Sequence, residues 1–192
     1  MNSTLPIATL LLAAGSSSRL GHPKQLLPFR GTTLLRHAAQ TALEADLGPL
    51  FVVLGSRESD CRKVLSGLPL TIVFNWNWQE GLGTSIATGM VEIDESSFRA
   101  VLLTLCDQPF VTASDFRALA DALLGHDIAA CDLGNTVGSP AIFGAACFPR
   151  LRSLRGPQGA KALFTEFSNL ATVQCSRALV DVDTKADAAR LV

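Results

Sequence analysis

Short apolar runs alternate with amphipathic stretches along most of the chain. Each run is about as long as a strand and is rich in leucine, valine, isoleucine or alanine. The pattern predicts strands at Ile7–Ala13, Leu50–Leu54, Leu70–Phe74 and Ala100–Leu105, with later strands near Ile128–Cys131, Ser139–Phe143, Thr172–Cys175 and Leu179–Val182.

The stretches between the runs have helical periodicity. In TTLLRHAAQTALEAD, leucine and alanine recur every three to four residues, Thr32 or Thr33 is placed to cap a helix, and Gly48-Pro49 would end it. A second stretch of this kind, TASDFRALADALLGHD, follows the fourth predicted strand. Strands that alternate with helices favour an α/β fold, with a mostly parallel sheet covered on both faces.

The length of 192 residues fits a single domain, which we expect to span residues 1–192. Ligands of open parallel sheets bind beyond the carboxyl ends of the strands. The segments to search for chemistry are therefore those that follow the predicted strands, namely Ala14–Lys24, Gly55–Arg57, Asn75–Ser85, Cys106–Pro109 and Asp183–Thr184.

Composition excludes several classes of partner. The formal charge is −1, no tract is rich in lysine and arginine, and aromatic residues make up 6% of the chain, so we expect no nucleic-acid partner. No apolar run approaches the roughly 20 residues of a membrane span, so we expect no membrane partner. The amino-terminal residues do not resemble a signal peptide, and the expected location is cytoplasmic.

The five cysteines lie far apart and form no CxxC pair. An odd number of cysteines in a chain of this expected location favours free thiols over a disulfide framework. With three histidines in the whole chain, a zinc site is not expected either.

The first loop, GSSSRLGHPK, has the ingredients of a phosphate site. Five residues separate Gly15 from Gly21, which excludes a Walker A loop, and no GxGxxG pattern is present. Small residues nevertheless let main-chain N–H groups approach an anion, and Arg19 and Lys24 add two positive charges. Two cations suit a polyphosphate better than a single phosphate. The alternative is an ordinary polar turn.

Two aspartates follow apolar runs. Asp107 lies two residues beyond the strand predicted at Ala100–Leu105, where a carboxylate opposite a phosphate loop suits Mg²⁺. Asp183, in LVDVDTKADAARLV, is a candidate for a second metal ligand or for a helix N-cap. A turn residue remains the alternative for Asp107.

The segment NWNWQEGLGTSIATGM follows the third predicted strand. Gly81 and Gly83 permit an unusual main-chain path there, and Thr84-Ser85 could open a helix whose amino end faces a ligand. Gly81 and Ser85 are therefore candidates for the border of a nucleotide or acceptor site.

Taken together, these segments resemble the nucleotidyltransferases that act on the molybdenum cofactor. LLAAGSSSRLGHPKQLLPFRG is similar to the family signature LAAGxSxRxGxxK, and NWNWQEGLGTSIATG resembles NxxWxxGxxxSxxxG. LLTLCDQPFV resembles the strand-Asp-Gln-Pro element, and DVDTKADAARL the terminal element. The four motifs occur in family order and span Ile7 to Leu191.

The resemblance implies a three-layer, Rossmann-like nucleotidyltransferase fold and a Mg²⁺-dependent reaction. The cytidylyltransferase branch of the family transfers CMP from CTP to the terminal phosphate of molybdopterin and releases pyrophosphate. The guanylyltransferase branch carries LAGG where this chain has Leu12-Ala13-Ala14-Gly15, and the methyl group of Ala14 favours a pyrimidine. A molybdoenzyme or its chaperone would be a further partner, beside the nucleoside triphosphate and a molybdopterin-type acceptor.

Each predicted role falls on a residue of a matched motif. The predicted catalytic residues are Arg19, Lys24 and Asp107, and the predicted metal ligands are Asp107 and Asp183. The predicted nucleotide-binding residues are Leu12, Ala13, Ala14, Gly15, Ser16, Ser17, Ser18, Arg19, Lys24, Gly81 and Ser85.

Two segments depart from the family pattern. Gly138-Ser139-Pro140 stands where relatives commonly have GHP, and GPQGAK, from Gly156 to Lys161, stands where they often have GDxGAR. These changes affect the predicted recognition of the acceptor more than the predicted binding of the nucleotide. A GTP-dependent guanylyltransferase, a sugar-phosphate nucleotidyltransferase and a non-catalytic molybdenum cofactor carrier therefore remain as alternatives.

Overall fold

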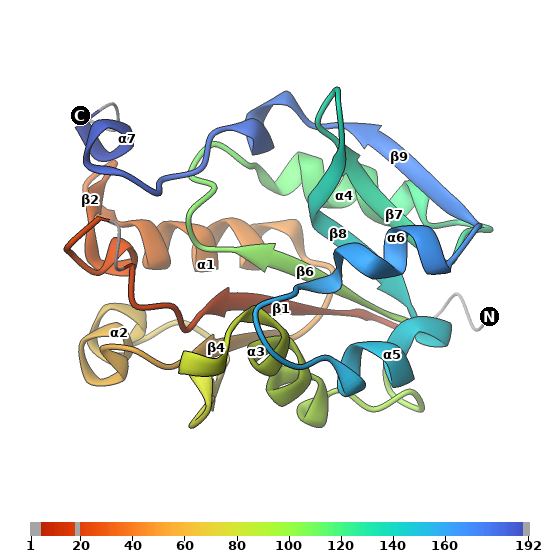
Figure 1. Cartoon of the computed structure of the whole chain (residues 1–192), viewed down its shortest axis with the longest axis horizontal. Helices are drawn as coiled ribbons and strands as arrows, with labels where there is room; N and C mark the ends of the chain where they lie inside the picture. The colour runs from red at the N-terminus through yellow and green to blue at the C-terminus, as the bar shows by residue number, and fades with distance from the viewer. Residues whose placement is uncertain (1–4, 18–19, 190–192) are drawn as a thin grey trace.

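The computed structural model describes residues 5–17 and 20–189. A seven-stranded sheet, in the order β5-β4-β1-β6-β8-β7-β9, runs through its centre (Figure 1). The strands are β1 (Ile7–Ala13), β4 (Leu50–Leu54), β5 (Thr71–Phe74), β6 (Ala100–Leu105), β7 (Ile128–Asp132), β8 (Val137–Gly144) and β9 (Leu170–Gln174). The short strands β2 (Pro28–Phe29) and β3 (Thr32–Thr33) form a separate hairpin.

Helices connect the strands. The α-helices are α1 (Leu34–Ala45), α2 (Glu58–Leu65), α3 (Leu82–Gly89), α4 (Ala113–Ala122), α5 (Phe148–Ser153), α6 (Leu163–Glu166) and α7 (Lys185–Ala189). The 3-10 helices are η1 (Lys24–Leu26), η2 (Trp78–Glu80), η3 (Met90–Glu92), η4 (Ala145–Cys147), η5 (Ala160–Ala162) and η6 (Ser176–Leu179).

The sheet is mostly parallel, as predicted. β1 pairs in parallel with β4 and β6, and β4 with β5, whereas β8 is antiparallel to both β6 and β7. All seven residues of β1 are buried, because helices cover both faces of the sheet. This double burial explains why the sequence of β1 is continuously apolar instead of alternating.

The two faces of the sheet support two separate cores. Leu11 and Ala13 of β1 pack with residues of α1, α2 and α4, whereas Leu10 and Leu12 pack with residues of α3 and α5. In Figure 1 the carboxyl ends of β1 and β6 point to the same side of the molecule, on the left. The loops that follow these two strands are therefore neighbours.

The helices α1 and α4 begin at threonines that the sequence marks as capping residues. The Thr33 hydroxyl accepts a hydrogen bond from the main-chain N–H of Arg36, as expected of an N-cap. α1 ends at Ala45, where Asp46 adopts the left-handed conformation, and Gly48-Pro49 follows. Thr112 caps α4 and forms a reciprocal capping box with Asp115.

The strand predicted at Leu179–Val182 is wrong. η6 ends at Leu179, and residues 180–189 join no sheet. Val182 is instead buried in a small cluster with Phe29 and Leu34. Burial against the β2–β3 hairpin therefore replaces strand pairing and carries the chain toward Asp183.

The prediction that every cysteine is a free thiol is also wrong. Cys131 and Cys175 form a disulfide, whereas Cys61, Cys106 and Cys147 are free and buried. β7 and β9 are parallel neighbours, with Cys131 opposite Val173, so their carboxyl ends bring the two cysteines together. The 44-residue separation in sequence conceals this contact.

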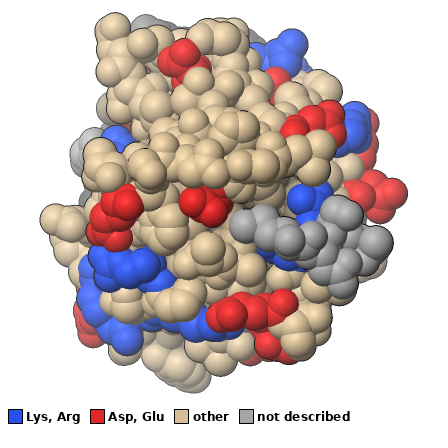
Figure 2. All heavy atoms as spheres, turned by 90° about the vertical axis from the view of Figure 1, so that its right-hand side faces the viewer, with Lys and Arg blue, Asp and Glu red and all other residues tan. Residues whose placement is uncertain are grey.

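The surface far from these strand ends carries mixed charge. Figure 2 shows basic side chains gathered at the lower left, with acidic side chains bordering them. Arg150 forms an ion pair with Glu166, and Arg152 with Glu95. Within residues 5–17 and 20–189, no helix has the length and apolar character that crossing a membrane requires.

Candidate functional site

The loop after β1 is fixed by buried polar contacts. The Gln25 side-chain amide, 1% exposed, donates to the main-chain oxygens of Ala13 (2.9 Å) and Gly15 (2.6 Å). The main-chain N–H of Lys24 donates to the Ser17 hydroxyl at 3.0 Å. η1 and the loop therefore hold one another in place. The predicted site residues Ser18 and Arg19 lie outside the described residues.

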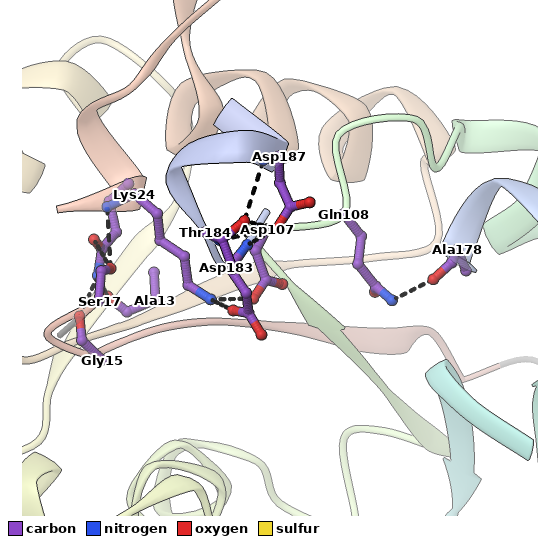
Figure 3. Close-up of polar contacts among 11 residues, drawn as sticks. Ala13, Gly15, Ser17, Lys24, Asp107, Gln108, Ala178, Asp183, Thr184 and Asp187 are labelled. Carbon is purple, nitrogen blue, oxygen red and sulfur yellow. Dashed lines mark hydrogen bonds and ion pairs between the residues drawn. The ribbon is translucent and has the colours of Figure 1, made fainter. Parts of the chain in front are cut away.

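Lys24 lies between the two carboxylates of the site and contacts both. Its ammonium nitrogen, Nζ, donates to Asp107 Oδ2 and, at 3.0 Å, to Asp183 Oδ1 (Figure 3). Asp107 follows β6, and Asp183 precedes α7. Segments 83 and 159 residues from Lys24 in sequence thus converge at the carboxyl ends of β1 and β6.

Partial burial strengthens the attraction between the charges of this cluster. The exposed fractions of the side chains are 17% for Lys24, 12% for Asp107 and 41% for Asp183. Burial by itself lowers the pKa of the Lys24 ammonium. The Asp107 charge and the hydrogen bonds to both carboxylates outweigh burial and raise that pKa above its usual value. Lys24 therefore stays protonated in the folded protein.

The alternative role predicted for Asp183, as the N-cap of a helix, is taken by Thr184. The main-chain N–H of Thr184 donates to Asp187 Oδ2 at 2.9 Å, and that of Asp187 donates to the Thr184 hydroxyl at 3.2 Å. This reciprocal exchange is the capping box that begins α7. It leaves the Asp183 carboxylate directed at Lys24.

The donor set fits a magnesium ion that also contacts substrate. Asp107 is 91% buried, with 9% exposed, and no hydrogen-bond donor of the described residues reaches its Oδ1. Among those residues, no group of three or more histidine, cysteine or acidic side chains could hold a metal. Magnesium usually takes one or two carboxylates and completes its shell with water and phosphate oxygens. Asp107 and Asp183 match that pattern.

Gly81 and Ser85 lie at the amino end of α3, on the face of the sheet opposite to the one that α1 covers. Gly81 has φ +120°, and a Cβ there would lie 2.5 Å from Pro157 Cα. Buried Asn75 donates to the Ser85 hydroxyl at 3.0 Å and to the Thr84 hydroxyl at 3.1 Å. The amino end of α3 is thus fixed by Asn75 on one side and covered by the 155–159 segment on the other.

A pocket of about 420 Å³ opens beside the strand ends on the α3 face of the sheet. Its walls are mainly apolar and consist of Leu12, Leu82, Ile86, Leu103, Leu105, Ser139, Ala141, Phe143, Pro157, Gln158, Gly159, Ala160, Lys161, Ala162 and Phe164. Both segments that depart from the family pattern line it, through Ser139 and through Pro157–Lys161. Leu12 connects the pocket to the loop after β1.

Gln108 ties the charge cluster to the pocket. Its buried amide donates to the main-chain oxygens of Ser139 (3.1 Å) and Ala178 (3.0 Å). Ser139 lines the pocket, and Ala178 lies in the segment that leads to Asp183. Gln108 and Asn75 fall within two of the matched motifs, but their hydrogen-bond partners, and those of Gln25, are not predictable from sequence, because an amide side chain does not reveal which groups it will contact.

Two other titratable groups adjoin the cluster. Burial, reinforced by the charge of Asp107, raises the pKa of the Cys106 thiol well above its usual value. Cys106 is also buried, and a buried thiol with a raised pKa is not expected to act as a nucleophile. Partial burial and the nearby Asp107 charge raise the pKa of Asp181 to about 6.

Comparison with known proteins identifies the family to which this chain belongs. Residues 9–173 match the family model described as the MobA-like NTP transferase domain. The molybdenum cofactor cytidylyltransferase of Escherichia coli is 25% identical over 189 residues, which cover 94% of this chain and 93% of the relative.

A second curated relative matches less of its own length. Nicotine blue oxidoreductase of Paenarthrobacter nicotinovorans is 37% identical over 110 residues, which cover 56% of this chain and 53% of the relative. The match thus spans about half of that protein.

A solved structure matches the fold throughout. Rv0371c of Mycobacterium tuberculosis superimposes with a TM-score of 0.85 and 29% identity, covering 97% of both chains. A second structure of Rv0371c, described as a complex with manganese, gives a TM-score of 0.82 at 28% identity and covers 97% of both chains.

Proposed function

Because the chain belongs to the MobA-like NTP transferase family, and is thus a nucleotidyltransferase, we propose that it transfers CMP from CTP to the terminal phosphate of a molybdopterin-type acceptor. The observation that carries this proposal is the position of Lys24, between Asp107 and Asp183 and next to a glycine-serine loop. Cations beside a phosphate loop, with carboxylates opposite, match the charge distribution of a metal–triphosphate complex.

In this mechanism an acceptor phosphate oxygen attacks the α-phosphorus of CTP. A new bond forms between that oxygen and the α-phosphorus, the bond from the α-phosphorus to the bridging oxygen of the β-phosphate breaks, and pyrophosphate leaves with that electron pair. The loop from Ala14 to Ser18, together with Arg19 and Lys24, would hold the β- and γ-phosphates. Catalysis would then consist of positioning and charge neutralisation, without a covalent enzyme intermediate.

Asp107 and Asp183 would hold the metal ion, for which Mg²⁺ is proposed. Bound there, the ion would supply Lewis-acid stabilisation of the charge on the α-phosphate. Asp107 is the stronger candidate ligand because it is the more buried of the two and its Oδ1 has no described donor. The manganese complex of Rv0371c supports a divalent ion in a protein of this fold.

The apolar pocket is the proposed acceptor site. It opens on the α3 face beside the carboxyl ends of β1 and β6, so an acceptor bound there could direct its phosphate toward Asp107. A flat ring would lie against its apolar walls, and the main chain and side chain of Gln158, together with Lys161, offer polar contacts. Gly81 and Ser85 would border the nucleotide on the same side.

The preference for CTP rests on Ala14. This residue is 5% exposed, and its main-chain oxygen accepts a hydrogen bond from the N–H of Ser56 at 2.9 Å. A methyl group held this firmly at the end of β1 narrows the space beside the loop, which favours a pyrimidine over a purine. Leu12, Ala13 and Gly15, the neighbours of Ala14 along the chain, are the other proposed nucleotide-binding residues of this segment.

The test is pyrophosphate release, measured with each nucleoside triphosphate and Mg²⁺, with and without molybdopterin. Release with CTP and molybdopterin alone is the expected result. Release with GTP would reassign the chain to the guanylyltransferase branch, and release only with a sugar phosphate would reassign the acceptor. Molybdopterin binding without release under any pairing would replace the enzyme by a cofactor carrier, which hands the cofactor to a molybdoenzyme or its chaperone.

A further inference from the structure

We infer that the Lys24 ammonium is a displaceable counter-ion, which occupies the cation position between Asp107 and Asp183 until a nucleoside triphosphate draws it away. Metal and nucleotide would then bind cooperatively, and the metal would bind weakly without the nucleotide. The inference rests on the proposed function, because it concerns the same site and its regulation.

The contacts of Lys24 place a positive charge where a divalent cation would bind. Its Nζ touches one oxygen of Asp107 and one oxygen of Asp183, and these carboxylates come from separate segments. Among the residues that the structure describes, no other basic side chain forms an ion pair with Asp107. Lys24 therefore supplies the charge neutralisation that a metal ion would otherwise provide.

The main chain of Lys24 is anchored to the phosphate loop. Its N–H is bonded to Ser17, and neighbouring Gln25 is bonded to Ala13 and Gly15. The flexible side chain can therefore move while its base stays fixed. Through the contact with Ser17, the base of the side chain adjoins the loop that would hold a triphosphate.

Charge explains why the two cations would exclude one another. A divalent ion placed next to an ammonium in a partly buried site is strongly repelled. Two carboxylates are also few ligands for magnesium, which normally adds phosphate oxygens. A triphosphate on the loop would give Lys24 a new anionic partner and would give the metal the oxygens it lacks. Each ligand would then raise the affinity of the other by the same factor.

The experiment measures Mn²⁺ binding to the full chain by electron paramagnetic resonance, with and without the non-hydrolysable analogue α,β-methylene-CTP. Without nucleotide, Lys24→Met should bind Mn²⁺ about tenfold more tightly than the wild type, because the competing charge is gone. Lys24→Arg keeps the charge and should match the wild type. The control Lys63→Met removes an exposed lysine of α2 and should also match it.

The nucleotide arm tests the coupling. The analogue should tighten Mn²⁺ binding to the wild type at least about tenfold, and this gain should shrink severalfold in Lys24→Met. Circular dichroism establishes that the variants fold, and if Lys24→Met does not, the wild-type coupling decides alone. Equal or weaker Mn²⁺ binding by folded Lys24→Met without nucleotide, or no coupling in the wild type, would overturn the inference. Neither result affects pyrophosphate release by the wild type, which tests the proposed function separately.

Discussion

The charge cluster and the apolar pocket occupy neighbouring places in the fold but have opposite chemistry. Lys24, Asp107 and Asp183 form a charged centre whose partners come from three distant segments. The pocket beside it has walls mainly of leucine, isoleucine, alanine and phenylalanine. Both lie where ligands of parallel α/β sheets bind, beyond the strand ends.

This difference separates the general part of the reaction from the specific part. Under the proposed function, the charges and a metal would recognise the triphosphate, which is the same in every nucleoside triphosphate. The shape of the pocket would recognise the body of the acceptor. The segments that depart from the family pattern line the pocket, and the residues that match it form the cluster. Substitutions in the two regions should therefore have different kinetic effects.

The largest effect is expected for Asp107→Asn. It keeps the size of the side chain but removes a charge that Lys24 and the metal both need, so kcat should fall by about 10³-fold, or roughly 4 kcal/mol in the barrier. Pyrophosphate release measures the loss. The control Asp121→Asn, at an exposed position of α4, should retain full activity. Full activity of Asp107→Asn would remove Asp107 from the mechanism.

Gln108→Leu should weaken both regions by loosening the link between them. The change leaves the carbonyls of Ser139 and Ala178 without their side-chain donor, at a cost of about 2–4 kcal/mol in the free energy of unfolding. Urea denaturation measures it. The matched control Gln40→Leu, at an exposed position of α1, should change stability by less than about 0.5 kcal/mol. Equal stability of the two variants would show that Gln108 is not a structural link.

Lys161→Gln should affect the pocket alone. Among the described residues that line the pocket, Lys161 is the one that carries a positive charge, and it is exposed, so its loss should raise the KM for the acceptor about five- to tenfold. Initial rates at varied acceptor concentration measure this, and the KM for CTP should not change. A rise in the KM for CTP instead would place Lys161 on the nucleotide side.

The smallest effect is expected for the pH dependence of stability. The folded protein keeps a proton on Asp181 up to about pH 6, whereas an unfolded aspartate loses it near pH 3.8. The folded state thus binds more protons between about pH 4 and 6, so Asp181 should make stability fall as pH rises through this window. Because Asp181 is only partly buried, screening by solvent reduces the effect.

Thermal unfolding between pH 4 and 7 measures this contribution against Asp181→Asn, which should show a flatter pH profile. Identical profiles for the variant and the wild type would exclude Asp181 as the group responsible.

Periodicity and burial predicted the fold well where elements are buried on both faces. The strands Ile7–Ala13, Leu50–Leu54 and Ala100–Leu105 have the predicted bounds, since a strand inside a parallel sheet is apolar throughout. The strand expected at Leu179–Val182 was wrong, because Val182 packs against a hairpin that lies far away in sequence. The disulfide escaped prediction for a similar reason, since β7 and β9 become neighbours only through the sheet order.

The candidate site likewise has a part that sequence motifs indicate and a part that only tertiary packing creates. Motifs indicated Lys24, Asp107 and Asp183 individually, because charged residues after apolar runs are visible in sequence. Their mutual contact depends on tertiary packing, as do the hydrogen bonds of the Gln25, Asn75 and Gln108 amides. Asn75 and Gln108 are positions of matched motifs, but the motifs do not specify these partners. The apolar pocket likewise draws on five separate stretches of the chain.

The central claim is that the charge cluster directs attack to the α-phosphorus. The direct measurement uses CTP labelled with ³²P at either the α or the γ position, together with Mg²⁺ and molybdopterin, and follows the label in the product. We expect the α label to enter the acceptor product and the γ label to leave entirely as pyrophosphate. Transfer of the γ label to the acceptor would contradict it.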